Sequence, residues 1–199
     1  MKIFNKWETK EVISADLGIA KYLCLKEKVI PHTHGARKST PVEKAKVNVV
    51  ERLINKLMRS GQGKKKLSGK FIRGKKGCGK KDLMIKSVDL AFDYINKTTK
   101  ENPIQVLVKA LEFSAPREDV VRLQRGGVVS NQAVDLAPIK RLDEALKNLA
   151  LAAFSKTFKV KKELSVALAE EIILASKNDQ KSYAVKKRDE IERIAQSSR

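Results

Sequence analysis

From residue 48 onward, apolar residues recur at the three- and four-residue spacing of amphipathic helices. The clearest stripe is Val50, Leu53, Ile54 and Leu57, and further stripes begin near residues 82, 103, 138, 164 and 182. A helix with one apolar stripe buries it against its neighbours. The pattern therefore predicts a mainly α fold, a bundle of about six helices.

Three of these helices carry capping signals at their first turns. Asn48 is followed by Glu51, and Asn102 by Gln105. At this spacing two side chains cap a helix reciprocally, because each accepts from an otherwise unpaired amide of the first turn. Asp82 is the candidate cap of the helix that follows it.

The pattern changes over residues 117 to 136, REDVVRLQRGGVVSNQAVDL. Here polar and apolar residues alternate, which is typical of strands. The pair Gly126-Gly127 lies between the two runs and favours a tight turn, because both glycines accept positive φ. The apolar face of these runs is thin. We therefore predict a β-hairpin that projects from the helices.

The remaining segments divide the chain into an extension and a domain. Residues 1–46 are weakly patterned, with short strands expected at Val12–Ile13 and Tyr22–Leu25, and they are predicted to form a basic N-terminal extension. Residues 47–199 are predicted to form one helical domain. Inside it, residues 61–81, GQGKKKLSGKFIRGKKGCGKK, hold six of the ten glycines, nine basic residues and no acid. This composition predicts a flexible cationic loop.

The charge of the chain points to its partner. Its 199 residues include 43 Lys and Arg against 23 Asp and Glu, a net charge of +20. So much like charge repels itself in a compact fold, so a polyanionic partner is expected. Aromatic residues make up only 5%, and no segment matches the aromatic strand motif of the RNA-recognition fold. Contacts to phosphates and to RNA shape are therefore favoured over a platform of stacked bases.

The location expected from the sequence is the cytoplasm. No run of 18 apolar residues occurs, so no membrane partner is expected. The first residues, MKIFNKWETKEV, lack the apolar core of a secretory signal. Cys24 and Cys78 lie far apart, which is typical of free thiols in a reducing compartment.

The stretch GKKGCGKK, residues 74–81, resembles a phosphate loop through Gly74, Gly79 and Lys80. Lys81, however, occupies the place of the Ser or Thr that would hold magnesium. A phosphate loop also connects a strand to a helix, and no parallel strand is predicted before it. A phosphate-loop ATPase therefore remains an unfavoured alternative. A helix-turn-helix DNA regulator is another, although no recognition helix stands out.

Catalytic and metal-binding patterns are equally weak. His32 and His34 form a pair, but zinc needs about four ligands and neither cysteine has a ligand spacing. A structural loop is the favoured interpretation of the pair. No nucleophile elbow or paired carboxylates stand out. We expect no catalytic residues, no metal and no cofactor.

Three long stretches resemble one family. They are NPIQVLVKALEFSAPREDVVRLQRGGVVSNQAVDLAPIKRLDEALKNLALAA (102–153), SYAVKKRDEIERIAQSSR (182–199) and PHTHGARKSTPVEKAKVNVVERLINKLM (31–58). Together they are similar to the ribosomal small-subunit protein seven family, in its archaeal and eukaryotic form. The resemblance implies a non-enzymatic protein in the head of the small subunit. There it would bind the 3′ major domain of the small-subunit rRNA, contact neighbouring head proteins and help to assemble the head.

The resemblance also implies where RNA is met. The family's hairpin approaches the exit-site tRNA and the mRNA path, which places Arg122, Arg125, Gly126 and Gly127 near them at the tip. Basic residues of the leading segment, the loop, the hairpin base and two later helices are the candidate rRNA contacts: Arg37, Lys38, Lys64, Lys65, Lys66, Arg73, Lys75, Lys76, Lys80, Lys81, Arg117, Lys140, Arg141, Lys186, Lys187 and Arg188.

Overall fold

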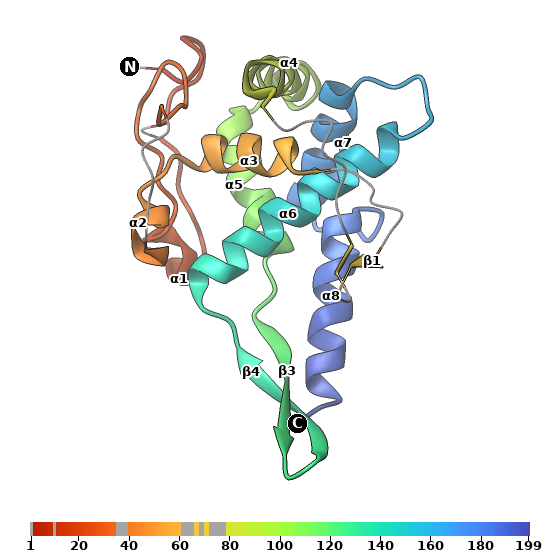
Figure 1. Ribbon diagram of the computed structural model, residues 1–199. Coiled ribbons are helices and arrows are strands. Elements are labelled where there is room, and N and C mark those ends of the chain that lie inside the picture. Colours follow the sequence, from red (N-terminus) through yellow and green to blue (C-terminus); the bar gives the residue numbers. More distant parts are fainter. Residues whose placement is uncertain (1, 10, 35–39, 61–65, 68–69, 72–78) are drawn as a thin grey trace.

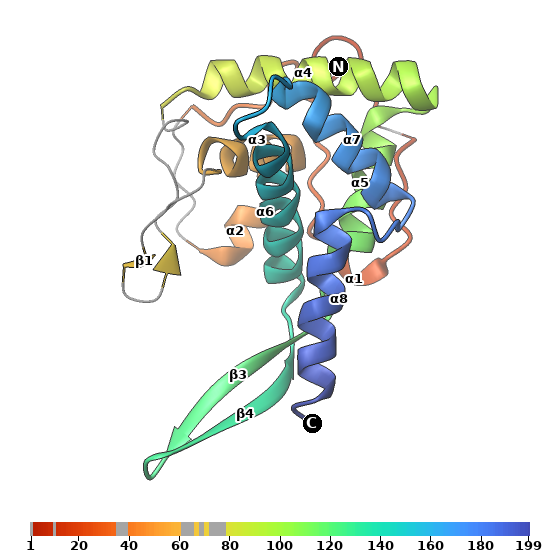
Figure 2. The ribbon, with the colours of Figure 1, turned by 90° about the vertical axis from the view of Figure 1, so that its right-hand side faces the viewer.

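The computed structural model describes residues 2–9, 11–34, 40–60, 66–67, 70–71 and 79–199. Helices make up most of the body, and one long hairpin extends away from it (Figures 1 and 2). The elements in chain order are α1 (Leu17–Ala20), α2 (Pro41–Ala45), α3 (Val49–Met58), β1 (Lys66–Leu67), β2 (Lys70–Phe71), α4 (Lys81–Thr99), α5 (Pro103–Ser114), β3 (Glu118–Arg125), β4 (Val128–Asp135), α6 (Pro138–Thr157), α7 (Leu164–Ser176) and α8 (Tyr183–Gln196).

The six predicted helices are confirmed as α3 to α8, and the mainly α fold with them. The two short helices α1 and α2 were not predicted. They have four and five residues, too few to show the periodicity of an apolar stripe. Each is capped instead by a single side chain, Asp16 for α1 and Thr40 for α2.

The capping predictions are half right. Asn48 and Asn102 do accept hydrogen bonds from first-turn amides, at 2.9 and 3.0 Å. Their expected partners do not reach back, because Glu51 and Gln105 are bound to segments far away in sequence. Asp82 is not a cap either. It lies inside the first turn of α4, where its charge favours the helix dipole.

The core lies where α7 packs against α4, α5 and α6, and where α3 packs against α4 and α6. Small side chains on α6 and α7 allow these two helices to approach closely, and the larger ones fill the space between helices. Fully buried members of this core include Leu53, Phe92, Leu107, Leu146, Leu168 and Ile172. Burial of these apolar surfaces is the main source of stability in the body.

The first thirty residues run along the helical body rather than away from it (Figure 1). Ile3 and Ile19 are fully buried in the common core, and the ring of Phe4 meets that of Phe92 edge-on at 6.2 Å. The expected strand at 12–13 is wrong, and the one at 22–25 is reduced to a single bridge between Cys24 and Asn48. The division of the chain at residue 46 stays a prediction.

The predicted hairpin is confirmed. Strands β3 and β4 pair antiparallel from Glu118 with Asp135 to Arg125 with Val128. Gly126 and Gly127 form the turn with φ of 54° and 84°, the region that glycine enters without a steric penalty. The hairpin extends beyond the ends of the helices, with α8 beside its base (Figure 2).

The predicted cationic loop lies mostly outside the described residues. Within it, Lys66–Leu67 and Lys70–Phe71 form a short antiparallel ladder, β1 with β2. No strand was predicted there. Two-residue strands leave no alternation to detect, and glycine and lysine are both uncommon in strands.

Phe92→Ala should lower the free energy of unfolding by about 3–5 kcal/mol, because it removes a fully buried ring from the point where α4 meets the core. Leu90→Ala on the same helix is the control. Leu90 is 55% exposed, so its loss should cost no more than about 0.5 kcal/mol. Urea unfolding of both variants measures the difference, and equal losses would show that the outer face of α4 is also buried in solution.

Candidate nucleic-acid interface

The basic residues predicted around the hairpin base do come together. The backbone of the connection from α5 to β3 is held by side chains of α6 and α8. The carbonyl of Pro116 accepts from Arg141 Nε at 3.2 Å, and the carbonyl of Phe113 accepts from Arg188. The amide of Arg117 donates to Glu192 at 2.9 Å. We call residues 113–119, with Lys140, Arg141 and Arg188, the hairpin root.

The cations of the root differ in how far they are already occupied. Arg141 is largely buried and pairs with Asp16 at 2.8 Å. Arg188 contacts Asp189 at 2.5 Å and Asn178 at 3.1 Å. Burial alone would raise the pKa of Asp16, but the hydrogen bonds from Arg141 and the Gly18 amide outweigh it and lower that pKa. These guanidinium groups therefore hold the root together.

Other cations of the root and of α8 face solvent. The side chain of Arg117 is exposed, and within the described part of the chain it makes no ion pair. The same holds for Lys186 near the start of α8. Lys140 and Lys187 have only loose or exposed partners, Asp119 at 3.6 Å and Glu190 at 2.7 Å. An exposed pair of this kind is weak, so all four charges remain available to an anion.

Lys80 and Lys81, at the end of the basic loop, also differ in whether a carboxylate of the fold already binds them. Lys80 is exposed, whereas Lys81 donates to the buried carboxylate of Glu51 at 2.7 Å. Glu51 also accepts from the amide and hydroxyl of Thr33, both at 2.9 Å. Burial alone would raise the pKa of Glu51, but the bonds from Lys81 and Thr33 lower it. Lys81 thus joins the segment before α2 to the starts of α3 and α4.

This geometry also bears on the phosphate-loop resemblance. Helix α4 does start directly after Gly79 and Lys80. However, both sheets in the described residues are two-stranded and antiparallel, so no parallel strand delivers the loop to the helix. The residue in the magnesium-holding position, Lys81, is a cation paired with Glu51. The described part of this segment therefore lacks the features that bind a nucleotide.

The hairpin tip lies at the opposite end of the hairpin from the root (Figure 1). Arg122 is exposed on β3, Arg125 ends that strand, and Gly126 and Gly127 form the exposed turn. The tip and the root are thus two separate places for contact. Of the remaining candidates, Lys66 lies in β1, and those outside the described residues are Arg37, Lys38, Lys64, Lys65, Arg73, Lys75 and Lys76.

One basic cluster was missed by the sequence analysis. The carboxylate of Asp143 on α6 is contacted by Lys44 from α2, by Arg52 at 3.1 Å and by Lys56 at 3.5 Å, both from α3. Three cations thus surround one anion. Burial alone would raise the pKa of Asp143, but the Lys44 hydrogen bond and the charges of Lys56 and Arg52 lower it. No sequence signal marks this cluster, because its members come from three separate segments.

The histidine pair and the hydropathy of the helices bear on metal binding and on membrane insertion. The rings of His32 and His34 lie 4.4 Å apart, and Nδ1 of His32 accepts from the His34 amide at 2.6 Å. A ring nitrogen used in this way holds a turn. No group of three or more potential metal ligands occurs among the residues that the structure describes. Among them there is also no helix with the length and hydropathy needed to cross a bilayer.

The fold and its surface define a class of protein: a helical, strongly basic body with a projecting hairpin that carries cations at its root and towards its tip, as expected for an RNA-binding protein. The sequence profile of the family described as ribosomal protein S7p/S5e matches residues 19–199. The chain therefore belongs to the ribosomal protein S7p/S5e family.

Relatives from two archaea match along almost the whole chain. The small ribosomal subunit protein uS7 of Methanococcus aeolicus is 42% identical over 200 residues, which cover 100% of this chain and 99% of that protein. The uS7 protein of Methanothermobacter thermautotrophicus is 42% identical over 196 residues, 98% of each chain. These matches confirm the family with its archaeal relatives, a ribosomal rather than enzymatic role, and the cytoplasmic small ribosomal subunit as the place of the protein.

Asp143→Asn should lower the free energy of unfolding at pH 7 by about 1–3 kcal/mol, because three cations lose their common partner. The pKa of Asp143 is lower in the folded chain. Its contribution is therefore present above the unfolded-state pKa of about 3.9 and is lost as pH falls through the folded value. Urea unfolding across this range should show the deficit shrinking on acidification.

Glu190→Gln is the matched control for this experiment. Glu190 is an exposed carboxylate paired with Lys187, and the bond from Lys187 lowers its pKa too. Because the pair is exposed, its loss should leave stability unchanged within error. A deficit for Asp143→Asn that stays constant down to low pH would contradict the assigned role of its charge.

Proposed function

We propose that this protein binds the 3′ major domain of the small-subunit rRNA, helps to assemble the head of the subunit, and holds its hairpin near the exit-site tRNA and the mRNA path. The observation that carries the proposal is the family match over residues 19–199, joined to relatives named as small-subunit proteins. Neighbouring head proteins are the further partners in this proposal.

The charge distribution supports this function physically. RNA helices repel one another, and a protein that neutralises their phosphates releases counterions and lets the helices approach. A rigid body is needed to keep such cations at fixed positions. Here Arg141 and Arg188 fix the root through the carbonyls of Pro116 and Phe113, while Arg117 of the root and Lys186 of α8 are exposed to solvent.

The structure of the hairpin supports the part of the proposal that concerns the exit-site tRNA and the mRNA path. Val121, Val128 and Val129 are 40%, 71% and 59% exposed, so the arm contributes little to the core. An isolated two-stranded ribbon is marginally stable in water. The arm is held at its base instead, where α8 lies along β3. A ribbon anchored in this way can reach a site beyond the body without being needed for the fold.

Replacing Arg117 and Lys186 together with glutamine should weaken binding to a 3′ major domain rRNA fragment and leave the free protein equally stable. Each lost phosphate contact lowers the log–log slope of affinity against salt by ~0.7 to 0.9, so the slope should fall by about 1.5. Filter binding at several salt concentrations measures it. The control, Lys97→Gln with Lys100→Gln, removes the same charge from exposed positions on and after α4. Equal effects in both pairs would contradict specific contacts at the root.

Replacing residues 122–132 with a short turn should spare folding and subunit incorporation but disturb events at the exit site. Frame maintenance and retention of deacylated tRNA are the quantities to measure, on the same particles that are scored for incorporation. A finer variant, Arg122→Gln with Arg125→Gln, keeps the ribbon and removes its two tip cations. Loss of incorporation with a melted body would assign the ribbon to the core. Normal incorporation with unchanged exit-site behaviour would remove the role of the arm.

A further inference from the structure

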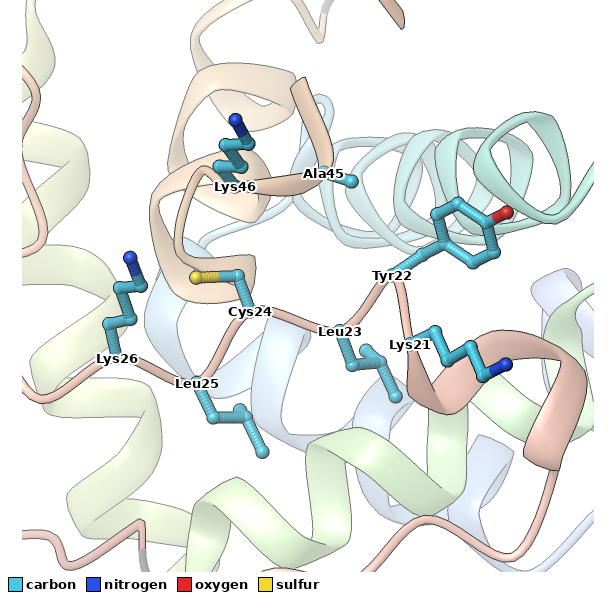
Figure 3. Close-up of a pocket in the computed structure, with 8 residues that line it drawn as sticks. All are labelled: Lys21, Tyr22, Leu23, Cys24, Leu25, Lys26, Ala45 and Lys46. Carbon is cyan, nitrogen blue, oxygen red and sulfur yellow. The ribbon is translucent and has the colours of Figure 1, made fainter. Parts of the chain in front are cut away.

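The segment of residues 21–26 borders a hollow of about 440 Å³ (Figure 3). This volume lies in the range of sites that hold small ligands, ~300 to 1,000 Å³. We call it the Cys24 groove. Its lining has three lysines and no acid: Lys21, Tyr22, Leu23, Cys24, Leu25, Lys26, Ala45 and Lys46.

Side chains alternate along this extended segment. Leu23 and Leu25 point toward the helices and pack against the core, whereas Cys24 and Lys26 lie on the other side (Figure 3). In the same view the Cys24 thiol lies between the stems of Lys26 and Lys46. The ring of Tyr22 stands at the opposite end of the segment. Lys26 and Lys46 thus lie at one end of the groove, and Tyr22 lies with Lys21 at the other (Figure 3).

The segment is fixed in place by helix α3. The carbonyls of three alternate residues, 22, 24 and 26, each accept a hydrogen bond from the first turns of this helix. The donors are Arg52 Nη1 at 3.5 Å, the Val49 amide at 3.0 Å and Asn48 Nδ2 at 2.8 Å. A groove that is already ordered costs little conformational entropy when it is filled.

The positive charge of the groove is not neutralised by the body. Lys21, Lys26 and Lys46 are exposed, and none of them has an ion pair in the described part of the chain. The adjoining cluster of Lys44, Arg52 and Lys56 has the single carboxylate of Asp143. The occupant that fits is therefore an anion with a flat apolar part, since the lysines need the charge and the tyrosine ring offers a stacking surface.

We propose that the Cys24 groove holds one unpaired nucleotide of the rRNA, with its flanking phosphates on Lys26 and Lys46 and its base against Tyr22. This inference rests on the proposed function, because it assumes that the protein binds rRNA. It adds a site for a single-stranded residue, lined by residues that are not part of the hairpin root. It needs one aromatic ring rather than a platform of them, in keeping with the few aromatic residues of the chain.

Cys24 makes the site directly measurable, because it is a free, partly exposed thiol in the groove. In a Cys78→Ser background, Cys24 is the only thiol of the chain. Its alkylation by iodoacetamide should slow by at least about tenfold when the protein is saturated with a 3′ major domain rRNA fragment. Binding is followed in parallel by filter retention. Bound RNA with an unchanged alkylation rate overturns the groove, whereas no RNA binding at all overturns the proposed function instead.

Two sets of variants distinguish the binding of a nucleotide in the groove from the binding of a simple anion. Tyr22→Leu keeps an apolar side chain in the partly buried position and should weaken RNA binding roughly tenfold, as loss of one stacked base does. Tyr22→Phe keeps the ring and should restore affinity. Lys21, Lys26 and Lys46 replaced together with glutamine should lower the salt slope by about 2, more than the charge-matched set Lys97, Lys100 and Lys177. Equal slopes in the two sets would overturn the phosphate contacts.

Two further outcomes would also overturn the proposal. Heparin is a polyanion without bases, so a nucleotide site requires heparin to protect Cys24 less than RNA does at equal occupancy. Equal protection by heparin and RNA would show that charge alone fills the groove. Protection that arises only when other head proteins are added, and not with RNA alone, would assign the groove to an acidic segment of a protein neighbour.

Discussion

Buried carboxylates hold this very basic chain in one piece. Glu51 joins the segment before α2 to the starts of α3 and α4, and Asp143 joins α2 and α3 to α6. Glu171, which is fully buried, accepts from Ser182 at 2.7 Å and pairs with Lys156, and so joins α6, α7 and α8. A buried charge must be paired. Each of these acids therefore fixes basic or polar groups from segments that are far apart in sequence, in a chain where like charges would otherwise push them apart.

The cations fall into two groups, according to whether they have a partner within the fold. Arg52, Lys81, Arg141 and Arg188 are bound within the fold, whereas Arg117, Arg122 and Lys186 extend into solvent. Each member of the first group has a carboxylate partner, which offsets part of its repulsion within the fold. The second keeps its full charge for a partner. A polyanion is thus met by a subset of the Lys and Arg residues, and that subset is set by tertiary contacts.

How much of this was readable from the sequence depends on the range of each interaction. The long helices and the hairpin follow from local periodicity and from Gly126-Gly127, so they were predicted correctly. The roles of Glu51 and Gln105 were not, because their partners Thr33, Lys81 and Ile13 lie outside the helices that they begin. For the site, residue type indicated candidate cations. Residue type alone does not distinguish a solvent-exposed lysine from one that is paired within the fold, such as Lys81. It also does not predict the cluster around Asp143 or the Cys24 groove.

The order in which the chain is synthesised gives the last helix a particular importance. Strand β4 ends at Asp135 and α8 ends at Gln196, so the hairpin is synthesised well before that helix is complete. The base of the hairpin nevertheless depends on α8 and the residues after it: Glu192 accepts from the Arg117 amide, Arg188 holds the carbonyl of Phe113, and Arg199 pairs with Glu118. A nascent chain thus carries a ribbon without this support until α8 has been synthesised and can fold back onto it. A chain that ends before α8 therefore lacks the contacts that hold the hairpin root.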